Sequence, residues 1–197
     1  MPFGASHDEP HVIETVLWKS IPWPGHEAAR LLEHGLERGL EGAAAFLHDS
    51  QVCRLDYSIV CNDDWSTRNA TVDGWVGTRE IHIAIEAANG TWSLNGVEQP
   101  QVAGCIDVDL NFSPSTNVLP IRRLNLAVGE SQVVRAAWLR FPSFVLEPLE
   151  QRYTRIAEDR VHYESFTTNF SAELRVSANG MVLDYENIWR AETDRER

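Results

Sequence analysis

The chain has 197 residues, of which 43% are hydrophobic and 23% charged, values typical of a globular protein with its own core. Its 17 Lys and Arg residues against 29 Asp and Glu residues leave a formal net charge of −12. Because phosphate backbones and anionic lipid surfaces repel such a protein, we expect neither a nucleic-acid partner nor electrostatic binding to membranes.

Residues 1–10 are polar and contain neither a basic nor an apolar stretch, so we expect an N-terminal extension and no secretory signal. No run of residues is long and apolar enough to predict integral membrane association. Cys53, Cys61 and Cys105 lack CxxC spacing, which is typical of reduced thiols. Together these features predict a cytoplasmic location.

The segment 27–47 is ambiguous in its secondary structure. It is rich in Ala, Leu, Glu and Arg, which favour a helix. Gly35, Gly39 and Gly42 interrupt it, however, and each costs about 1 kcal/mol in a helix interior relative to Ala. We therefore expect two strands, 28–34 and 43–48, on either side of a turn around 37–41.

From residue 52 onward, apolar and polar residues alternate, which predicts β-strands. The apolar positions are Cys53, Leu55, Tyr57 and Ile59; Ile81, Ile83 and Ile85; Ile106, Val108, Leu110 and Phe112; Val133, Ala137, Leu139 and Phe141, with Arg135 on the same face; and Phe170, Ala172, Leu174 and Val176. Three Asn-Gly pairs, at 89–90, 95–96 and 179–180, are typical of tight hairpin turns.

This pattern predicts an all-β fold, an antiparallel meander of roughly ten or more strands. No linker-like stretch or internal repeat divides the chain. We expect a single domain over 11–191, preceded by the extension 1–10 and followed by a polar tail over 192–197.

Two carboxylates provide the first candidate site. Asp107 and Asp109 share one face of a predicted strand, with Cα atoms about 6.7 Å apart. Such a pair could supply the acid and base of glycoside hydrolysis or the oxygen ligands of a hard cation. The alternative is a solvated pair, or a pair bound to arginine.

The arginines of that alternative follow at once. A loop restricted by Pro114 and Pro120 leads to Arg122 and Arg123. Two adjacent guanidiniums can hold phosphate, carboxylate or sugar hydroxyls, and they can equally pair with the two aspartates.

Tryptophan side chains could stack on sugars or line apolar cavities. Trp65, Trp75 and Trp189 are the candidates for such contacts, whereas the other tryptophans in strand-like alternation favour a structural role; these are Trp18, Trp92 and Trp138. The seven histidines form no metal-ligand spacing, and Cys105 is best interpreted as a small buried hydrophobic residue. We predict no metal and no cofactor.

Several segments resemble a bacterial family of glycolipid-binding proteins, formerly a domain of unknown function. They are LDY at 55–57, CNDDWSTR at 61–68, GCIDVDL at 104–110, FSPSTNVLPIRRL at 112–124, AAWLRFP at 136–142, QRY at 151–153 and the closing stretch 180–189. The departures from the family pattern are small: Asn62 is an insertion, and Ser113 and Val118 replace threonines.

The resemblance implies a single-domain spiral β-roll, which supports strands over a helix in 27–47. It implies that the chain binds a glycolipid or similar amphiphile without catalysis, holding the lipid tail in an apolar groove of the roll. The predicted ligand-binding residues, all in or near the matching segments, are Trp65, Arg68, Asp107, Asp109, Asn117, Arg122, Arg123, Arg140, Tyr153 and Trp189.

Two alternatives from other classes stay open. One is an enzyme of glycolipid or carbohydrate metabolism that uses Asp107 and Asp109 as its acid/base pair. The other is a scaffold whose sheet edge recruits a protein partner.

Overall fold

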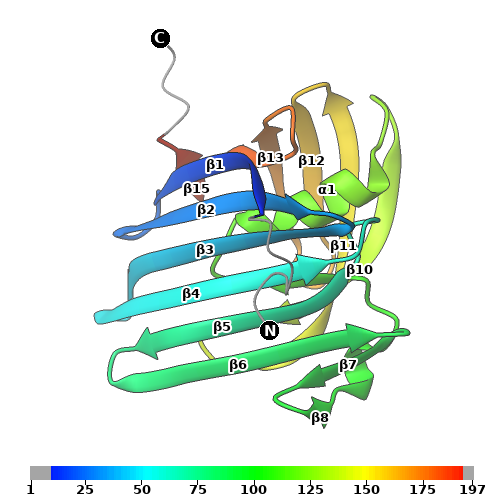
Figure 1. Cartoon of the computed structure of the whole chain (residues 1–197). Coiled ribbons are helices and arrows are strands. Elements are labelled where there is room, and N and C mark those ends of the chain that lie inside the picture. The colour runs from blue at the N-terminus through cyan, green and yellow to red at the C-terminus, as the bar shows by residue number, and fades with distance from the viewer. Residues whose placement is uncertain (1–9, 193–197) are drawn as a thin grey trace.

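The computed structural model describes residues 10–192, and within them fifteen strands form one sheet (Figure 1). The first eight strands follow the chain as a meander in which each strand pairs with the next in antiparallel fashion. They are β1 (His11–Ser20), β2 (Gly25–His34), β3 (Glu37–His48), β4 (Gln51–Cys61), β5 (Thr67–Val76), β6 (Arg79–Ala88), β7 (Thr91–Leu94) and β8 (Val97–Glu98).

The second half of the chain returns to the first strand. Its last strand, β15, pairs with β1, so that the order across the sheet runs from β8 to β1 and then from β15 to β9. The strands are β9 (Asp107–Leu110), β10 (Ser131–Leu139), β11 (Leu146–Ala157), β12 (Arg160–Ser165), β13 (Phe170–Val176), β14 (Val182–Tyr185) and β15 (Trp189–Ala191). The described residues also form three helical segments, which are the 3₁₀ turns η1 (Pro100–Val102) and η2 (Ser115–Asn117) and the helix α1 (Val118–Leu124).

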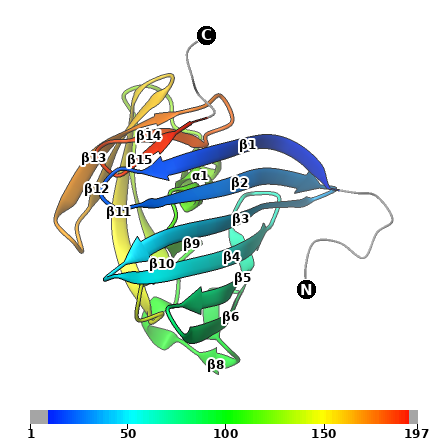
Figure 2. The same cartoon turned by 90° about the vertical axis from the view of Figure 1, so that its left-hand side faces the viewer.

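The sheet rolls up around α1, as the two views in Figures 1 and 2 show. Its edges, β8 and β9, do not pair with each other, so the roll stays open. The edge strand β9 is nevertheless fastened to β5, because the Thr67 amide donates to the Ile106 carbonyl (3.0 Å) and the Val108 amide donates to Thr67 Oγ1 (2.9 Å).

The interior holds two large clusters of buried hydrophobic side chains. The larger one joins β1–β7 to β9 and includes Trp18 and Leu55, neither of which is exposed at all. The second lies between α1 and β10–β14 and includes Leu174 and Val182. The polar residues of β9, Asp107 and Asp109, face this second cluster, because they bond to Arg123 of α1 and Gln151 of β11. The candidate site lies on this side of β9.

The structure confirms the all-β prediction and adds one difference in strand direction. β9 and β10 run parallel, whereas the other paired strands of residues 10–192 are antiparallel. A parallel pair needs a long connection, and α1 with its flanking segments provides it between these two strands.

The segment 27–47 is indeed two strands, but the turn was predicted in the wrong place. It lies at residues 35–36, where Gly35 has a φ of 58°, and the predicted turn region 37–41 is part of β3. A left-handed φ suits glycine, so Gly35 marks the turn, while Gly39 and Gly42 lie inside a strand. The Tyr57 ring occupies the space that a side chain at position 42 would need.

Other details of the predicted pattern also changed. Ile106 precedes β9 and is 42% exposed. Val133 and Arg135 are exposed, whereas Ala137 and Leu139 are buried against β9, which explains why an arginine is tolerated in this alternation. The predicted extension and tail lie outside the described residues except for Pro10 and Glu192, and the domain division stays a prediction. None of the helices within 10–192 has the length and hydropathy needed to cross a membrane.

Candidate functional site

A pocket of about 240 Å³ receives at least one residue from every strand between β9 and β15 and one from the β1–β2 turn. Its aromatic lining consists of Trp23, Trp138, Tyr163, Phe170, Tyr185 and Trp189. Five of these rings pack in edge-to-face or tilted pairs, with centroids 6.3 Å apart for Trp23 and Trp189 and 6.2 Å apart for Tyr163 and Phe170. Trp189 is only 3% exposed, whereas Trp23 is 38% exposed, so we place the mouth of the pocket at Trp23.

Polar side chains complete the pocket wall. Most of them come from β9 and the segment that follows it, and the others from the end of β12 and the turn beyond. They are Asp109, Asn111, Ser113, Asn117, Ser165 and Thr168. The pocket therefore combines flat apolar rings with hydrogen-bonding groups.

Asp109 is the charged group of the pocket. Its Oδ2 accepts a hydrogen bond from Gln151 Nε2 (2.9 Å), which also donates to Tyr163 Oη (3.0 Å). Burial, together with a smaller effect of the Asp107 charge, raises the pKa of Asp109 from 3.8 to about 6, and the hydrogen bond from Gln151 opposes part of this rise. Enclosed in this way, Asp109 can accept hydrogen bonds from a ligand in surroundings of low dielectric constant.

Asn117 is fixed in the wall by two hydrogen bonds. Its Oδ1 accepts from Tyr153 Oη (3.0 Å), and its Nδ2 donates to the Pro114 carbonyl (3.1 Å). Burial raises the pKa of Tyr153 well above its ordinary value, so that this hydroxyl remains a donor. Tyr153 therefore orients Asn117 without itself lining the pocket.

A buried carboxyl lies behind Ser113. Glu27 Oε1 accepts hydrogen bonds from Ser113 Oγ (2.5 Å) and Tyr57 Oη (2.6 Å), while Glu27 Oε2 has no hydrogen-bond partner among residues 10–192. Ser115 Oγ lies 2.7 Å from Ser113 Oγ and 2.7 Å from Tyr57 Oη, within hydrogen-bond distance of both. Burial raises the pKa of Glu27 from 4.5 to about 8, and the two hydroxyl bonds lower it only in part. At neutral pH the Glu27 side chain is therefore mostly a neutral acid.

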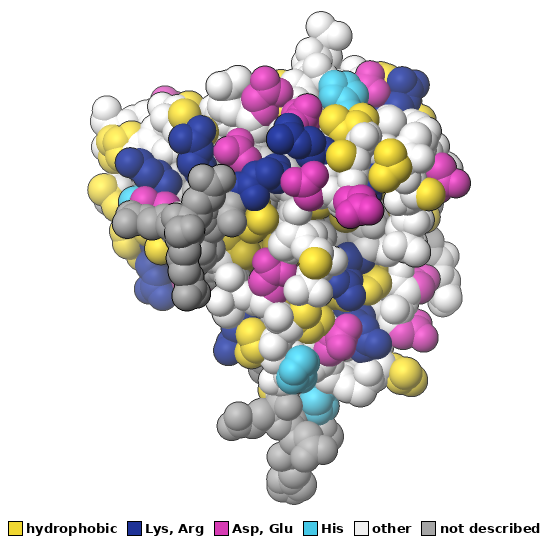
Figure 3. Space-filling view, turned by 90° about the horizontal axis from the view of Figure 1, so that it is seen from above, with side chains coloured by type: hydrophobic (Ala, Val, Ile, Leu, Met, Phe, Trp, Pro, Cys, Tyr) yellow, Lys and Arg dark blue, Asp and Glu magenta, His cyan; other side chains and the backbone are white. Residues whose placement is uncertain are grey.

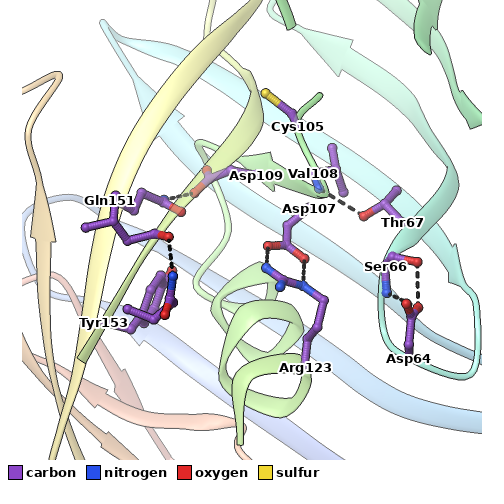
Figure 4. A network of polar contacts seen from close by, with 12 residues as sticks. Asp64, Ser66, Thr67, Cys105, Asp107, Val108, Asp109, Arg123, Gln151 and Tyr153 are labelled. Carbon is purple, nitrogen blue, oxygen red and sulfur yellow. Dashed lines mark hydrogen bonds and ion pairs between the residues drawn. The ribbon is translucent and has the colours of Figure 1, made fainter. Parts of the chain in front are cut away.

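Asp107 has a different environment from Asp109 two residues away (Figure 4). It is 1% exposed and accepts two hydrogen bonds from the Arg123 guanidinium at the end of α1, one of them from Nε at 3.0 Å. Burial raises the pKa of Asp107, and Arg123 opposes part of that effect. The pair fastens α1 to β9 and is not part of the pocket wall.

The remaining predicted arginines also have partners. Arg122 donates to the Asn179 carbonyl (2.9 Å) and lies over the Trp65 ring, 4.5 Å from its centroid. Arg68 pairs with Glu37. On the face shown in Figure 3, side chains of Lys and Arg are interspersed with those of Asp and Glu.

Arg140 contacts a residue of the pocket wall, Trp138. It pairs with Glu147 (3.2 Å) and lies over Trp138, 4.8 Å from the ring centroid. Trp138 itself lines the pocket, although we expected it to be structural.

The predicted site residues thus fall into two groups. Asp109, Asn117 and Trp189 line one pocket, while Tyr153 donates to Asn117 and Arg140 lies over the ring of Trp138. The others lie elsewhere: Trp65, Arg68, Asp107, Arg122 and Arg123. Five of the ten predicted residues therefore line this pocket or contact its wall. That any of the ten binds a ligand stays a prediction.

Sequence reasoning missed several residues of this site. Trp23 stands between two prolines, an arrangement that marks a rigid turn but does not reveal what the turn covers. Glu27 is on the same strand face as Ala29 and Leu31, both buried, and this parity was the available signal for a buried carboxyl. No group of three or more His, Cys, Asp or Glu residues suited to a metal ion occurs within residues 10–192.

Three larger depressions have less suitable linings. One of about 570 Å³ lies over β1–β4 among small side chains such as Ala28 and Ala43 and beside the paired Arg30 and Glu41. A second, of about 430 Å³, includes Arg68, and a third, of about 320 Å³, is lined by charged side chains alone. None of the three contains an enclosed carboxylate surrounded by aromatic rings.

Comparison with known proteins agrees with the fold. The model of a family described as "Putative glycolipid-binding" matches residues 15–191. A DUF1089 family protein from Pseudomonas aeruginosa is 29% identical, with a TM-score of 0.73 over 83% of this chain and 91% of that one. A β-barrel-like protein of domain of unknown function DUF1849 from Brucella abortus is 9% identical, with a TM-score of 0.55 over 92% and 94%, and shares the fold alone. No curated protein matches.

Proposed function

Because this chain belongs to the family described as "Putative glycolipid-binding", we propose that it binds a glycolipid or a similar amphiphile without catalysis, with the headgroup in the pocket around Asp109. The observation that carries the proposal is the combination of six aromatic rings with an enclosed, hydrogen-bonded carboxylate in one pocket.

The chemistry of the pocket suits a sugar. Indole and phenol rings offer flat apolar surfaces to the C–H faces of a sugar ring, and their own polar atoms tolerate the wet edge of a site. Sugar hydroxyls donate hydrogen bonds, for which Asp109 and Asn117 provide acceptors held in place by Gln151 and Tyr153. A site of this kind has its hydrogen-bonding geometry set before the ligand arrives.

The size of the pocket favours a headgroup over a whole lipid. Its volume of about 240 Å³ is below the range of roughly 300–1,000 Å³ that is typical of pockets enclosing drug-sized ligands. The alkyl chains would therefore remain outside, past Trp23 at the mouth. This differs from our expectation of a lipid tail inside the roll.

The state of Asp107 favours binding over catalysis. A pair of catalytic carboxylates needs one member free to donate and one free to attack or accept a proton. Both oxygens of Asp107 are held by Arg123, and the pair lies outside the pocket wall. This geometry supports a structural role for Asp107 and a ligand-binding role for Asp109.

The test is to block the pocket from its rim. Thr168 lies in the turn after β12 and lines the pocket, so Thr168→Trp should fill it without disturbing the core. The matched control is Thr78→Trp, an exposed threonine in the turn between β5 and β6. Both variants and the wild type would be presented with a panel of glycolipids and fatty acids in native mass spectrometry.

We expect the wild type and Thr78→Trp to retain one glycolipid per chain and Thr168→Trp to lose it. Equal binding by all three proteins would place the ligand elsewhere and contradict the proposal. Binding of none of the panel by delipidated wild-type protein would contradict it as well.

A further inference from the structure

Two turns at the pocket mouth expose large apolar side chains. The β1–β2 turn presents Ile21 (46% exposed) and Trp23 (38%), the β12–β13 turn presents Phe166 (43%), and Phe170 (36%) is the first residue of β13. We call these four residues the apolar rim. Exposed apolar patches of this kind mark sites that contact another apolar surface.

Both turns border the same pocket. Trp23 and Phe170 line it, as do Ser165 and Thr168, the residues on either side of the Phe166–Thr167 pair. The amide of Ile21 donates to the carbonyl of Ile188, another residue of the pocket wall (2.9 Å). Two residues of the apolar rim, Trp23 and Phe170, therefore line the pocket, and the other two lie on the same turns beside it.

The turns that carry the rim are uncharged. Residues 20–25 and 165–172 contain no Asp, Glu, Lys, Arg or His, although the chain as a whole carries a net charge of −12. Arg152, which packs on the Phe166 ring at 4.8 Å, is itself paired with Glu164 (3.3 Å). A surface without net charge suits a layer of neutral lipids. An anionic lipid layer would instead repel the rest of this acidic protein.

We propose that the apolar rim inserts into the surface of a membrane of neutral lipids, so that the pocket takes the headgroup of an amphiphile whose alkyl chains stay in the bilayer. The inference rests on the proposed function. Tryptophan is enriched at membrane interfaces, where one part of the ring is in an apolar environment and the other in water. Trp23 suits such a position, because it is 38% exposed while its ring packs on Trp189. With the alkyl chains left in the bilayer, a pocket of about 240 Å³ needs to hold only the headgroup of a much larger ligand.

The experiment is flotation with vesicles of phosphatidylcholine, with and without a neutral glycolipid. The test variant is Ile21→Ser with Phe166→Ser, because neither residue lines the pocket. The control is Leu36→Ser with Val97→Ser, which removes two apolar side chains that are 76% and 64% exposed in the β2–β3 turn and in β8. All three proteins would also be titrated with octyl glucoside below its micelle concentration.

We expect the wild type and the control to float with the vesicles, and the rim variant to lose roughly tenfold or more in vesicle affinity, given the apolar area removed. Its affinity for octyl glucoside should not change. Equal flotation of all three proteins, or no flotation of the wild type, would overturn the inference. A dimer that disappears in the rim variant, without vesicle binding, would overturn it in favour of self-association.

The two proposals can fail separately. Octyl glucoside binding without vesicle binding leaves the headgroup pocket intact and overturns the rim. Rim-dependent flotation without octyl glucoside binding supports the rim and contradicts the headgroup pocket.

Discussion

At the scale of single residues, Asp107 and Arg123 form the ion pair that fastens α1 to β9. Asp107→Asn removes the charge that compensates a guanidinium whose side chain is 14% exposed, and we expect a loss of about 3 kcal/mol of unfolding free energy, measured by urea denaturation. Asp56→Asn, at a pair with 57% and 40% exposed side chains, should cost less than about 1 kcal/mol. Equal losses in the two variants would show that the buried pair has no special structural role.

Glu27 makes the stability of the fold depend on pH. Its pKa of about 8 lies above the ordinary 4.5, so the folded protein binds this proton more tightly than the unfolded chain does. The resulting stabilisation is complete below the ordinary pKa and is lost as the pH rises through the folded pKa, by at most about 1.4 kcal/mol per pH unit.

The melting temperature of the wild type should therefore fall between about pH 6.5 and 8, and that of Glu27→Gln should fall less over the same range. Asp109→Asn is the control, because the raised pKa of Asp109, about 6, confines most of its effect to lower pH. That variant should keep the decline. A Glu27→Gln protein with the wild-type pH profile would mean that this carboxyl does not titrate in the range.

At the scale of elements, β9 is attached to β5 through one threonine, Thr67, by its backbone amide and its hydroxyl. Thr67 is 5% exposed, and its hydroxyl accepts from the buried Val108 amide. Thr67→Val keeps the shape but leaves that amide without an acceptor, which should cost about 1–3 kcal/mol by urea denaturation. Thr71→Val, a half-buried position on the same strand, should change stability by less than about 0.5 kcal/mol. A harmless Thr67→Val would imply that backbone pairing alone holds the edge.

The elements were largely predictable because alternation of apolar and polar residues reflects a sheet with one buried face. This alternation located the strands around Leu55, Ile83 and Leu174. The Asn-Gly pairs located the turns at 89–90 and 95–96, where all four residues have positive φ. It did not locate the turn at 35–36, since three glycines were available and only Gly35 adopts a left-handed conformation in this segment. The parallel pairing of β9 was beyond local pattern, because strand direction depends on a connection closed in three dimensions.

At the scale of the whole molecule, the site could be predicted only in part. Asp109, Asn117 and Trp189 came from segments that resemble a family, but Trp23 and Phe170 carry no local signal of a pocket. They meet because β15 pairs with β1 and brings the end of the chain beside its beginning. A pocket assembled from strands so far apart in sequence becomes visible only when the order of strands is known.

The central claim is that the ligand enters this pocket, and the indole N–H signals of the seven tryptophans can test it directly by NMR. In a titration with octyl glucoside, we predict that the signals of Trp23, Trp138 and Trp189 shift. Those of Trp18 and Trp92 should stay in place, because these rings are buried and donate to the carbonyls of Val182 and Cys105. Shifts confined to tryptophans outside the pocket, or no shift at saturating ligand, would contradict the account.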